Sequence, residues 1–344
     1  MPEREAPHLL PTGIIGGRAA ARAVQAGLAR PLAGGPLAFT AVEAVERDQR
    51  RLCELRSLPP AWEPRLQLLT RPRPPFAGLA LDRPLVMGIL NATPDSFSDG
   101  GRQLGTEAAV RHGLALLEAG ADLVDVGGES TRPGADPVAA EEQIRRVEPV
   151  IRALSERGAI LSVDTRDPQV MGAGLAAGAR IVNDVSALAA PGAAEAVART
   201  GASAILVHMQ GEPRTMQREP RYADVTSEVA EHLESRVAAC MAAGIGIERL
   251  AIDPGIGFGK RGAHNAALLA ELAALHGLGV PLVVGASRKG WIGALDSWPP
   301  DDRLGGSLSA ALAALDRGTQ ILRVHDVAQT CQARLGWMAL NHVA

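Results

Sequence analysis

The sequence predicts an α/β fold, a (β/α)8 barrel with an N-terminal extension, and three observations support this prediction. Eight short apolar segments alternate with helical segments, glycines close several of the helices, and each apolar segment ends on a polar residue. The 344 residues exceed the roughly 250 that such a barrel needs. An open, doubly wound sheet is the alternative, but eight units in succession and the lack of a GxGxxG motif favour the closed barrel.

The expected strands are short and rich in Leu or β-branched residues. They lie at 85–90, 122–127, 160–165, 180–185, 204–209, 250–255, 281–286 and 321–326. Between them, segments 141–156 and 224–242 repeat apolar residues at helical spacing. Glycines that would end helices precede the next strand at Gly120, Gly158, Gly178, Gly201 and Gly318. The barrel is therefore expected to occupy residues 74–344.

Residues 1–73 do not follow this alternation. They contain a segment rich in Gly, Ala and Arg at 13–35, a predicted helix at 41–55 and a proline-rich linker at 59–75. We expect either a small appended domain of unknown role or a partly ordered extension that packs on the barrel.

The composition excludes several classes of function. A net charge of -3 offers no global basic field for nucleic acid. The three cysteines are too far apart for a zinc pair, and their odd number argues against a disulfide framework, so we expect a cytoplasmic protein. Neither a membrane span of about 20 apolar residues nor a signal peptide is recognisable. Small apolar residues must build the core, because only 3% of residues are aromatic.

The polar residues at the strand ends predict one shared site. They are Asp125, Asp164, Asn183, His208, Asp253, Ser287 and the pair Arg323 and His325. Functional residues of such barrels cluster at the carboxyl ends of the strands. A strand-end Asp can instead cap the next helix, but Asp167, not Asp164, lies beside the expected helix start.

Arg323 and His325 point to one face of their strand because strand side chains alternate. An arginine facing the barrel interior is costly unless it meets an anion. Phosphate sites of these barrels follow strands seven and eight, where Ser287-Arg288-Lys289 and Arg323-Val324-His325 lie. The alternative for His325 is a structural histidine with satisfied hydrogen bonds.

A series of motifs resembles one family in order along the chain, from about Pro75 to the C-terminus. The motifs run Asn91 to Gly101, Gly128 to Gly134, Ser162 to Thr165, Val182 to Asp184, His208 to Gly211, Asp253 to Lys260, Ser287 to Lys289 and Arg323 to Asp326. They are similar to the signatures of the dihydropteroate synthases, whose fold is a TIM barrel. This family joins 6-hydroxymethyl-7,8-dihydropterin pyrophosphate to p-aminobenzoate and releases pyrophosphate and 7,8-dihydropteroate, a step of folate biosynthesis.

The resemblance implies three groups of substrate-binding residues. Those for the pterin are Asp164, Asn183, Asp253 and Lys289, and those for the diphosphate are Asn91, Arg132, Arg323 and His325. Those for p-aminobenzoate are Phe97, Thr131, Arg132, Pro133, Phe258 and Ser287. The resemblance also implies a Mg2+ ion at Asn91, a homodimer and sulfonamides as inhibitors. Loop packing is the alternative role for Phe97 and Phe258.

The chemistry expected at such a site is a dissociative, SN1-like substitution. A carbon on an electron-rich dihydropterin can lose pyrophosphate to leave a delocalised cation, which cationic side chains and metal assist by stabilising the departing charge. The expected catalytic residues are Asp164, Asp253, Lys289, Arg323 and His325. Two alternatives stay open. One is a pterin-binding barrel of the methyltetrahydrofolate:corrinoid methyltransferase type, and the other is a catalytically silent homologue.

Overall fold

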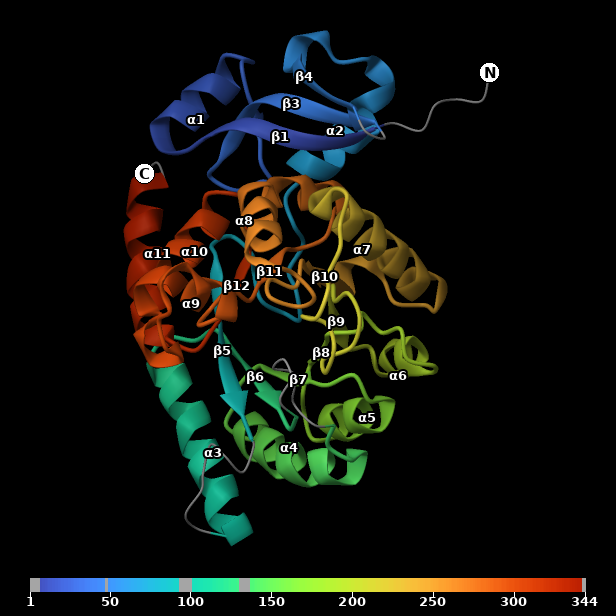
Figure 1. The fold of residues 1–344 in the computed structure, drawn as a ribbon, viewed down its shortest axis with the longest axis vertical. Helices are drawn as coiled ribbons and strands as arrows, with labels where there is room; N and C mark the ends of the chain where they lie inside the picture. The colour runs from blue at the N-terminus through green and yellow to red at the C-terminus, as the bar shows by residue number, and fades with distance from the viewer. Residues whose placement is uncertain (1–6, 47–48, 93–100, 130–136, 342–344) are drawn as a thin grey trace.

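The fold is a closed parallel barrel with a small antiparallel sheet at one end (Figure 1). The structure is a computed structural model that describes residues 7–46, 49–92, 101–129 and 137–341. The barrel strands are hydrogen-bonded in the order β10-β9-β8-β7-β6-β5-β12-β11, and a bridge between Ile252 and Leu282 joins the last strand to the first. The predicted barrel is therefore confirmed, and the open sheet is wrong.

All eight predicted strands are present. Their bounds are β5 Leu85–Asn91, β6 Leu123–Gly127, β7 Leu161–Asp164, β8 Ile181–Asp184, β9 Ser203–Val207, β10 Leu250–Asp253, β11 Val283–Val284 and β12 Ile321–Val324. Every neighbouring pair is parallel, as crossover connections through helices require.

Helices cover the outside of the barrel. The α-helices are α3 Gly101–Glu118, α4 Ala140–Ser155, α5 Pro168–Ala176, α6 Ala193–Thr200, α7 Val225–Ala242, α8 Gly262–Ala270, α9 Gly290–Asp296, α10 Leu304–Leu315 and α11 Val327–Asn341. Shorter 3-10 turns lie at η4 Ile247–Arg249, η5 Leu272–Leu278 and η6 Pro300–Asp302. The five glycines expected to close helices all have positive φ, which a residue without a Cβ adopts freely. No helix in the described ranges has the length and apolarity that a membrane span needs.

Apolar side chains fill the barrel interior in a layer. It includes Leu85, Met87, Leu123, Ile181, Ile205, Ala251, Val283 and Ile321, all buried. A second, larger cluster fills the space between the strands and the helices. Because strand side chains alternate, the residue two positions beyond each inner apolar residue also points inward, nearer the carboxyl end of the barrel.

The N-terminal residues form a small antiparallel sheet. Its strands are β1 His8–Ile15, β2 Arg30–Pro31, β3 Ala38–Glu46 and β4 Gln49–Glu54, and β3 pairs antiparallel with the other three. Helix α1 Gly17–Gln25 packs on this sheet, and η1 Leu55–Ser57, η2 Pro60–Trp62 and α2 Glu63–Thr70 lead to the barrel. In Figure 1 the sheet lies beside α8 and the end of α11, at the upper end of the molecule.

The helix predicted at 41–55 is wrong, because this segment forms the β3–β4 hairpin. The repeat Ala-Val-Glu-Ala-Val-Glu from Ala41 places apolar residues three apart, which suggested a helix. In the structure, pairing with β1 and burial of Val42 and Ala44 against the barrel side override that local pattern.

Candidate active site

A layer of polar side chains lies directly above the inner apolar layer, at the carboxyl ends of the strands. Asp125 stands two residues beyond Leu123, Asn183 beyond Ile181, Asp253 beyond Ala251 and Arg323 beyond Ile321. The register places Asp164 beside Asn183 and beside Gly127 on the other side. One alternation of side chains therefore produces both the core and the site.

Arg323 is the centre of this layer. Its Nε donates to Asp125 Oδ2 at 2.6 Å, and its Nη2 donates to Asp164 Oδ2 at 2.6 Å. Asn183 Nδ2 donates to the same Asp125 oxygen at 3.0 Å. We expected the inward-facing arginine to lie beside an anion, and two carboxylates supply the negative charge. They hold the guanidinium inside the mouth of the barrel.

Asp253 faces Arg323 across Gly285. Its Oδ2 lies 3.5 Å from the position that a Cβ on Gly285 would take, and Arg323 Cδ lies 3.7 Å from the same point. Asp253 Oδ1 accepts a hydrogen bond of 2.7 Å from the backbone N–H of Gly255. The expected acids and the expected anion-binding arginine therefore share one end of the barrel.

Lys289 and Phe258 form one wall of the mouth. The ammonium of Lys289 lies 3.8 Å from the centroid of the Phe258 ring, close enough for a cation–π interaction. Gly257 packs beneath Lys289, since an added Cβ would stand 3.1 Å from Lys289 Cδ. This contact and the φ of +83° at Gly257 both favour glycine there.

Burial shapes the charges of the mouth. It raises the pKa of Asp253 above its ordinary value, against the opposing effects of the Gly255 hydrogen bond and of Lys289. It also raises the pKa of Asp164, although Arg323 opposes the shift. Burial alone would lower the pKa of Arg323, but the carboxylates of Asp125 and Asp164 raise it, so the guanidinium remains charged.

His325 is neutral at pH 7 in this structure. Burial, followed by the nearby charge of Arg323, lowers its pKa to about 4. Its Nδ1 lies 3.1 Å from Ser287 Oγ, which also accepts from the His325 backbone N–H at 3.2 Å. The end of β12 and the segment after β11 are thereby joined where the sequence predicts a diphosphate site.

Two residues of the mouth were missed in assigning roles from the sequence. Asp125 was recognised only as a strand-end residue, yet it pairs with Arg323, and its Oδ1 has no hydrogen-bond partner within the described part of the chain. Lys260 is buried and contacts His208 Nδ1 at 2.8 Å and the carbonyls of Gly255 and Phe258 at 3.0 Å each. The side chain of Lys260 therefore holds the loop in place. The signal in the sequence was a lysine at the end of a glycine-rich loop.

The histidine beside Lys260 is buried, and its pKa is lowered. Burial and the Lys260 ammonium lower the pKa of His208 to about 2, and burial lowers the pKa of Lys260 to about 7. Asp184 is also buried, and it accepts from the backbone N–H groups of Ser186 at 2.7 Å and Leu188 at 2.8 Å. These contacts shape loops behind the mouth.

Several predicted residues cannot be placed. Phe97, Thr131, Arg132 and Pro133 lie outside the described residues. Asn91 is described, and it ends β5 on the inner face, paired in register with Gly127. The described ranges contain no group of three or more His, Cys, Asp or Glu that could hold a metal. Asn91 offers one amide oxygen, a ligand type that suits Mg2+ when phosphate oxygens and water complete its shell.

Comparisons with known proteins converge on one family. The model of the pterin binding enzyme family matches residues 87–325. Dihydropteroate synthase from Escherichia coli (strain K12) is 50% identical over 256 residues, covering 74% of this chain and 91% of that protein. The protein of the same name from Neisseria meningitidis serogroup B is 49% identical over 270 residues, covering 76% and 95%.

Solved structures agree with these sequence matches. Xanthomonas albilineans dihydropteroate synthase with 4-aminobenzoic acid superposes with a TM-score of 0.73 at 52% identity, covering 78% of this chain and 97% of that one. The same enzyme in complex with 7,8-dihydropteroate gives a TM-score of 0.70 at 49% identity, covering 77% and 97%. The family match begins at residue 87, beyond the N-terminal sheet.

Proposed function

This chain belongs to the pterin-binding enzymes and, within them, to the dihydropteroate synthases, and we propose that its barrel mouth binds the substrates of that reaction through the residues described above. The protein is a transferase of folate biosynthesis that makes 7,8-dihydropteroate from 6-hydroxymethyl-7,8-dihydropterin pyrophosphate and p-aminobenzoate. The observation that carries the residue assignment is the convergence of Asp164, Asp253 and Arg323 at one end of the barrel.

The pterin ring is assigned to the buried acids. Its 2-amino-pyrimidinone edge carries N–H groups that a carboxylate accepts in a bidentate manner. Asp253 supplies that carboxylate, and Asp164 and the amide of Asn183 face the remaining heteroatoms. Lys289 donates to the ring carbonyl and the adjacent ring nitrogen. The burial of Asp253 supports this role, because a buried carboxylate needs a donor.

The diphosphate is assigned to Arg323 and His325. Arg323 donates to two carboxylates, and we propose that it exchanges the Asp164 contact for diphosphate oxygens when substrate binds. Asp164, whose pKa is already raised by burial, then turns to the pterin. An anion beside His325 raises the pKa of its imidazole, so that it gains a proton as the diphosphate arrives.

Asn91 would hold a Mg2+ ion at the diphosphate site. Mg2+ commonly binds through one or two protein oxygens together with substrate phosphates and water. When bound, it supplies positive charge that stabilises the leaving diphosphate. Asn91 ends β5 at the carboxyl end of the barrel, and its amide oxygen would be the protein ligand.

The substitution breaks the bond between the pterin methylene carbon and the diphosphate oxygen, and the electron pair leaves with the diphosphate. Asp164 and Asp253 stabilise the resulting delocalised cation. The p-aminobenzoate nitrogen then forms the new C–N bond and loses one proton to solvent.

Phe258 provides the apolar wall for the benzoate ring, and Ser287 lies near its carboxylate. Phe97, Thr131, Arg132 and Pro133 complete this pocket by resemblance, with Arg132 also reaching the diphosphate.

The partners follow from the same assignment. The substrates are small molecules, and we expect neither nucleic acid nor membrane to be involved. A cytoplasmic homodimer remains our expectation, and a sulfonamide should compete with p-aminobenzoate because the two share the aniline ring. A structure of the Yersinia pestis family member contains a sulfonamide drug, which supports that expectation.

Pyrophosphate release tests the proposed function. The purified chain is mixed with the pterin pyrophosphate, Mg2+ and p-aminobenzoate, and both pyrophosphate and 7,8-dihydropteroate are quantified. We expect equal amounts of the two products. Folded protein that releases neither would identify a catalytically silent homologue. Methyl transfer from a methylated pterin without pyrophosphate chemistry would identify the methyltransferase type.

A further inference from the structure

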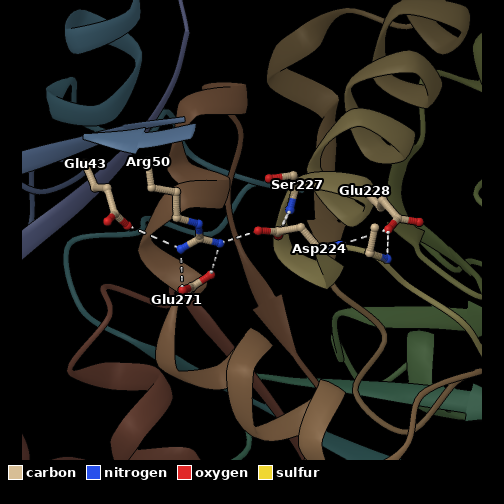
Figure 2. Close-up of polar contacts among 7 residues, drawn as sticks. Glu43, Arg50, Asp224, Ser227, Glu228 and Glu271 are labelled. Atoms are coloured by element: carbon tan, nitrogen blue, oxygen red, sulfur yellow. Dashed lines mark hydrogen bonds and ion pairs between the residues drawn. The ribbon is translucent and has the colours of Figure 1, made fainter. Parts of the chain in front are cut away.

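Arg50, on the β3–β4 hairpin of the N-terminal sheet, makes polar contacts with the barrel. Arg50 of β4 donates to Glu271 at 2.7 and 3.3 Å and to Glu43 of β3 at 3.3 Å, and it also pairs with Asp224 (Figure 2). The three acids come from the sheet, from the end of α8 and from the start of α7. The neighbouring carboxylates of Glu271 and Asp224 raise the pKa of Arg50, which therefore stays charged.

Asp224 ends the loop that connects β9 to α7. It is the N-cap of α7, since its Oδ1 accepts from the backbone N–H of Ser227 at 2.9 Å. Glu228 accepts from the backbone N–H groups of Ala223 at 2.6 Å and Asp224 at 3.1 Å. Arg50 therefore holds both a helix start and the last residues of this loop.

The β9–α7 loop in turn supports the loop that carries Phe258. Tyr222, two residues before Asp224, donates its hydroxyl to the carbonyl of Gly259 at 2.9 Å. Gln217 Nε2 donates to the carbonyl of Gly257 at 2.5 Å. These two hydrogen bonds lie on either side of Phe258. Gly259 also packs against Gln210 of the β9–α7 loop, because an added Cβ would stand 2.3 Å from the Gln210 carbonyl oxygen.

We propose that Arg50 of the appended N-terminal sheet is a positioning residue for the p-aminobenzoate pocket. It holds the β9–α7 loop against Gly257 and Gly259 and thereby sets the Phe258 ring beneath Lys289. This inference rests on the proposed function, in which Phe258 forms the wall for the benzoate ring. Arg50 itself contacts neither substrate, so its effect is on the geometry of a binding surface and not on the bonds that change.

Other contacts keep the sheet docked without Arg50. Arg65 of α2 pairs with Glu234 in the middle of α7 at 2.8 Å, and Arg71 donates to the carbonyl of Gly279 at 3.2 Å. The Arg65 pair also crosses from the N-terminal part to α7, with side-chain exposure of 31% for the arginine against 32% for Arg50. It does not involve the β9–α7 loop, so Arg65→Gln is a matched control for Arg50→Gln.

Steady-state kinetics of the full-length chain show whether Arg50 positions the p-aminobenzoate pocket or only stabilises the docked N-terminal sheet. We expect Arg50→Gln to raise the KM for p-aminobenzoate about threefold to tenfold, because a small displacement of a pocket wall weakens binding of the ring. The KM for the pterin pyrophosphate and kcat should stay within about twofold, and Arg65→Gln should leave all three parameters within about twofold. Thermal unfolding of each variant confirms that it is folded.

The route through Asp224 is tested by a double-mutant cycle. Asp224→Asn keeps a side-chain oxygen for the N-cap and removes the charge that faces Arg50. It should also raise the KM for p-aminobenzoate, and the double variant Arg50→Gln/Asp224→Asn should show no further rise, because the two residues act through one contact.

Two results would overturn the proposal. One is a KM for p-aminobenzoate that changes equally in Arg50→Gln and Arg65→Gln. The other is a rise in the KM for p-aminobenzoate in the double variant that equals the product of the rises in the two single variants. Failure of the wild-type chain to release pyrophosphate would instead contradict the proposed function, so the two failures are distinguishable.

Discussion

Two largely buried arginines, Arg323 at the barrel mouth and Arg73 at the junction with the N-terminal sheet, are held in opposite ways. Arg323 donates to two carboxylates, Asp125 and Asp164. Arg73 donates only to backbone carbonyls within the described part of the chain, those of Arg71 at 3.3 Å and of Leu68 and His276 at 2.9 Å each. A carboxylate partner can be exchanged for a substrate anion, whereas a backbone carbonyl belongs to the fold.

The pKa values of Arg73 and Arg323 are shifted in opposite directions. Burial, with a smaller effect of Arg71, lowers the pKa of Arg73 to about 10, since no carboxylate among the described residues offsets the loss of water. The two carboxylates keep the pKa of Arg323 above its ordinary value. Burial alone therefore does not mark a functional arginine. Neighbouring anions that substrate can replace are the better sign.

The sharpest test of this contrast is the effect of each arginine on activity. Arg323→Ala should lower kcat/KM by about 10³, because it removes a preorganised charge from the leaving group and leaves two buried carboxylates without their partner. Arg73→Met should leave kcat/KM within about twofold. Measuring product formation for both variants side by side checks this, and comparable losses in the two would erase the distinction.

The pterin acid should show the next largest effect. Asp253→Ala should weaken binding of the pterin pyrophosphate by at least about 100-fold, because a bidentate, charge-assisted contact is lost from a buried site. Calorimetric titration measures this affinity. Asp167→Ala, which removes only the N-cap of α5, serves as the control and should bind the pterin normally. Equal affinity in Asp253→Ala and wild type would show that the pterin lies elsewhere.

Replacing Arg73 should affect the stability of the fold. Arg73→Met should lower the free energy of unfolding by about 2 kcal/mol, because buried carbonyls lose their donor. Urea denaturation of wild type and variant gives this difference. A variant as stable as wild type would mean that the carbonyls at the junction find other donors.

Acid should weaken the same junction through His276. This side chain is fully buried beside Arg73, and burial followed by the Arg73 charge lowers its pKa to about 3. The unfolded chain, with a histidine pKa of about 6.5, binds the proton first, so the stability from His276 is complete above pH 6.5 and is lost as the pH falls toward 3.

The pH profile of unfolding isolates this contribution. We expect a loss of a few kcal/mol across that window, of order 1.4 kcal/mol per pK unit. His276→Gln keeps a donor for the carbonyl of Arg317, which His276 Nε2 contacts at 2.9 Å, but it cannot take up a proton. Its unfolding free energy should depend less on pH than that of wild type, and identical slopes would assign the acid sensitivity to other groups.

The sequence predicts the barrel and the end at which the site lies, because both follow from one short-range rule. Alternation along a strand places Arg323 on the same face as Ile321, and the order of strands brings the polar ends together. The partner of Arg323 could not be predicted in this way. Asp125 lies 198 residues away, and its contact depends on the closure of the barrel.

The N-terminal region shows where local pattern fails. The segment from Ala41 was predicted to be a helix, but pairing across three strands makes it part of a sheet. The contact from Arg50 to Asp224 spans 174 residues and joins the N-terminal sheet to the start of α7, so no sequence motif predicts it. Such links between an appended domain and a loop of the barrel need the structure.

Titration of inorganic pyrophosphate measures how strongly the Arg323 site binds an anion, with no chemical step involved. Wild type and Arg73→Met should bind pyrophosphate with the same affinity, and Arg323→Ala should bind it at least about tenfold more weakly. An unchanged affinity in folded Arg323→Ala would contradict the assignment of the anion site.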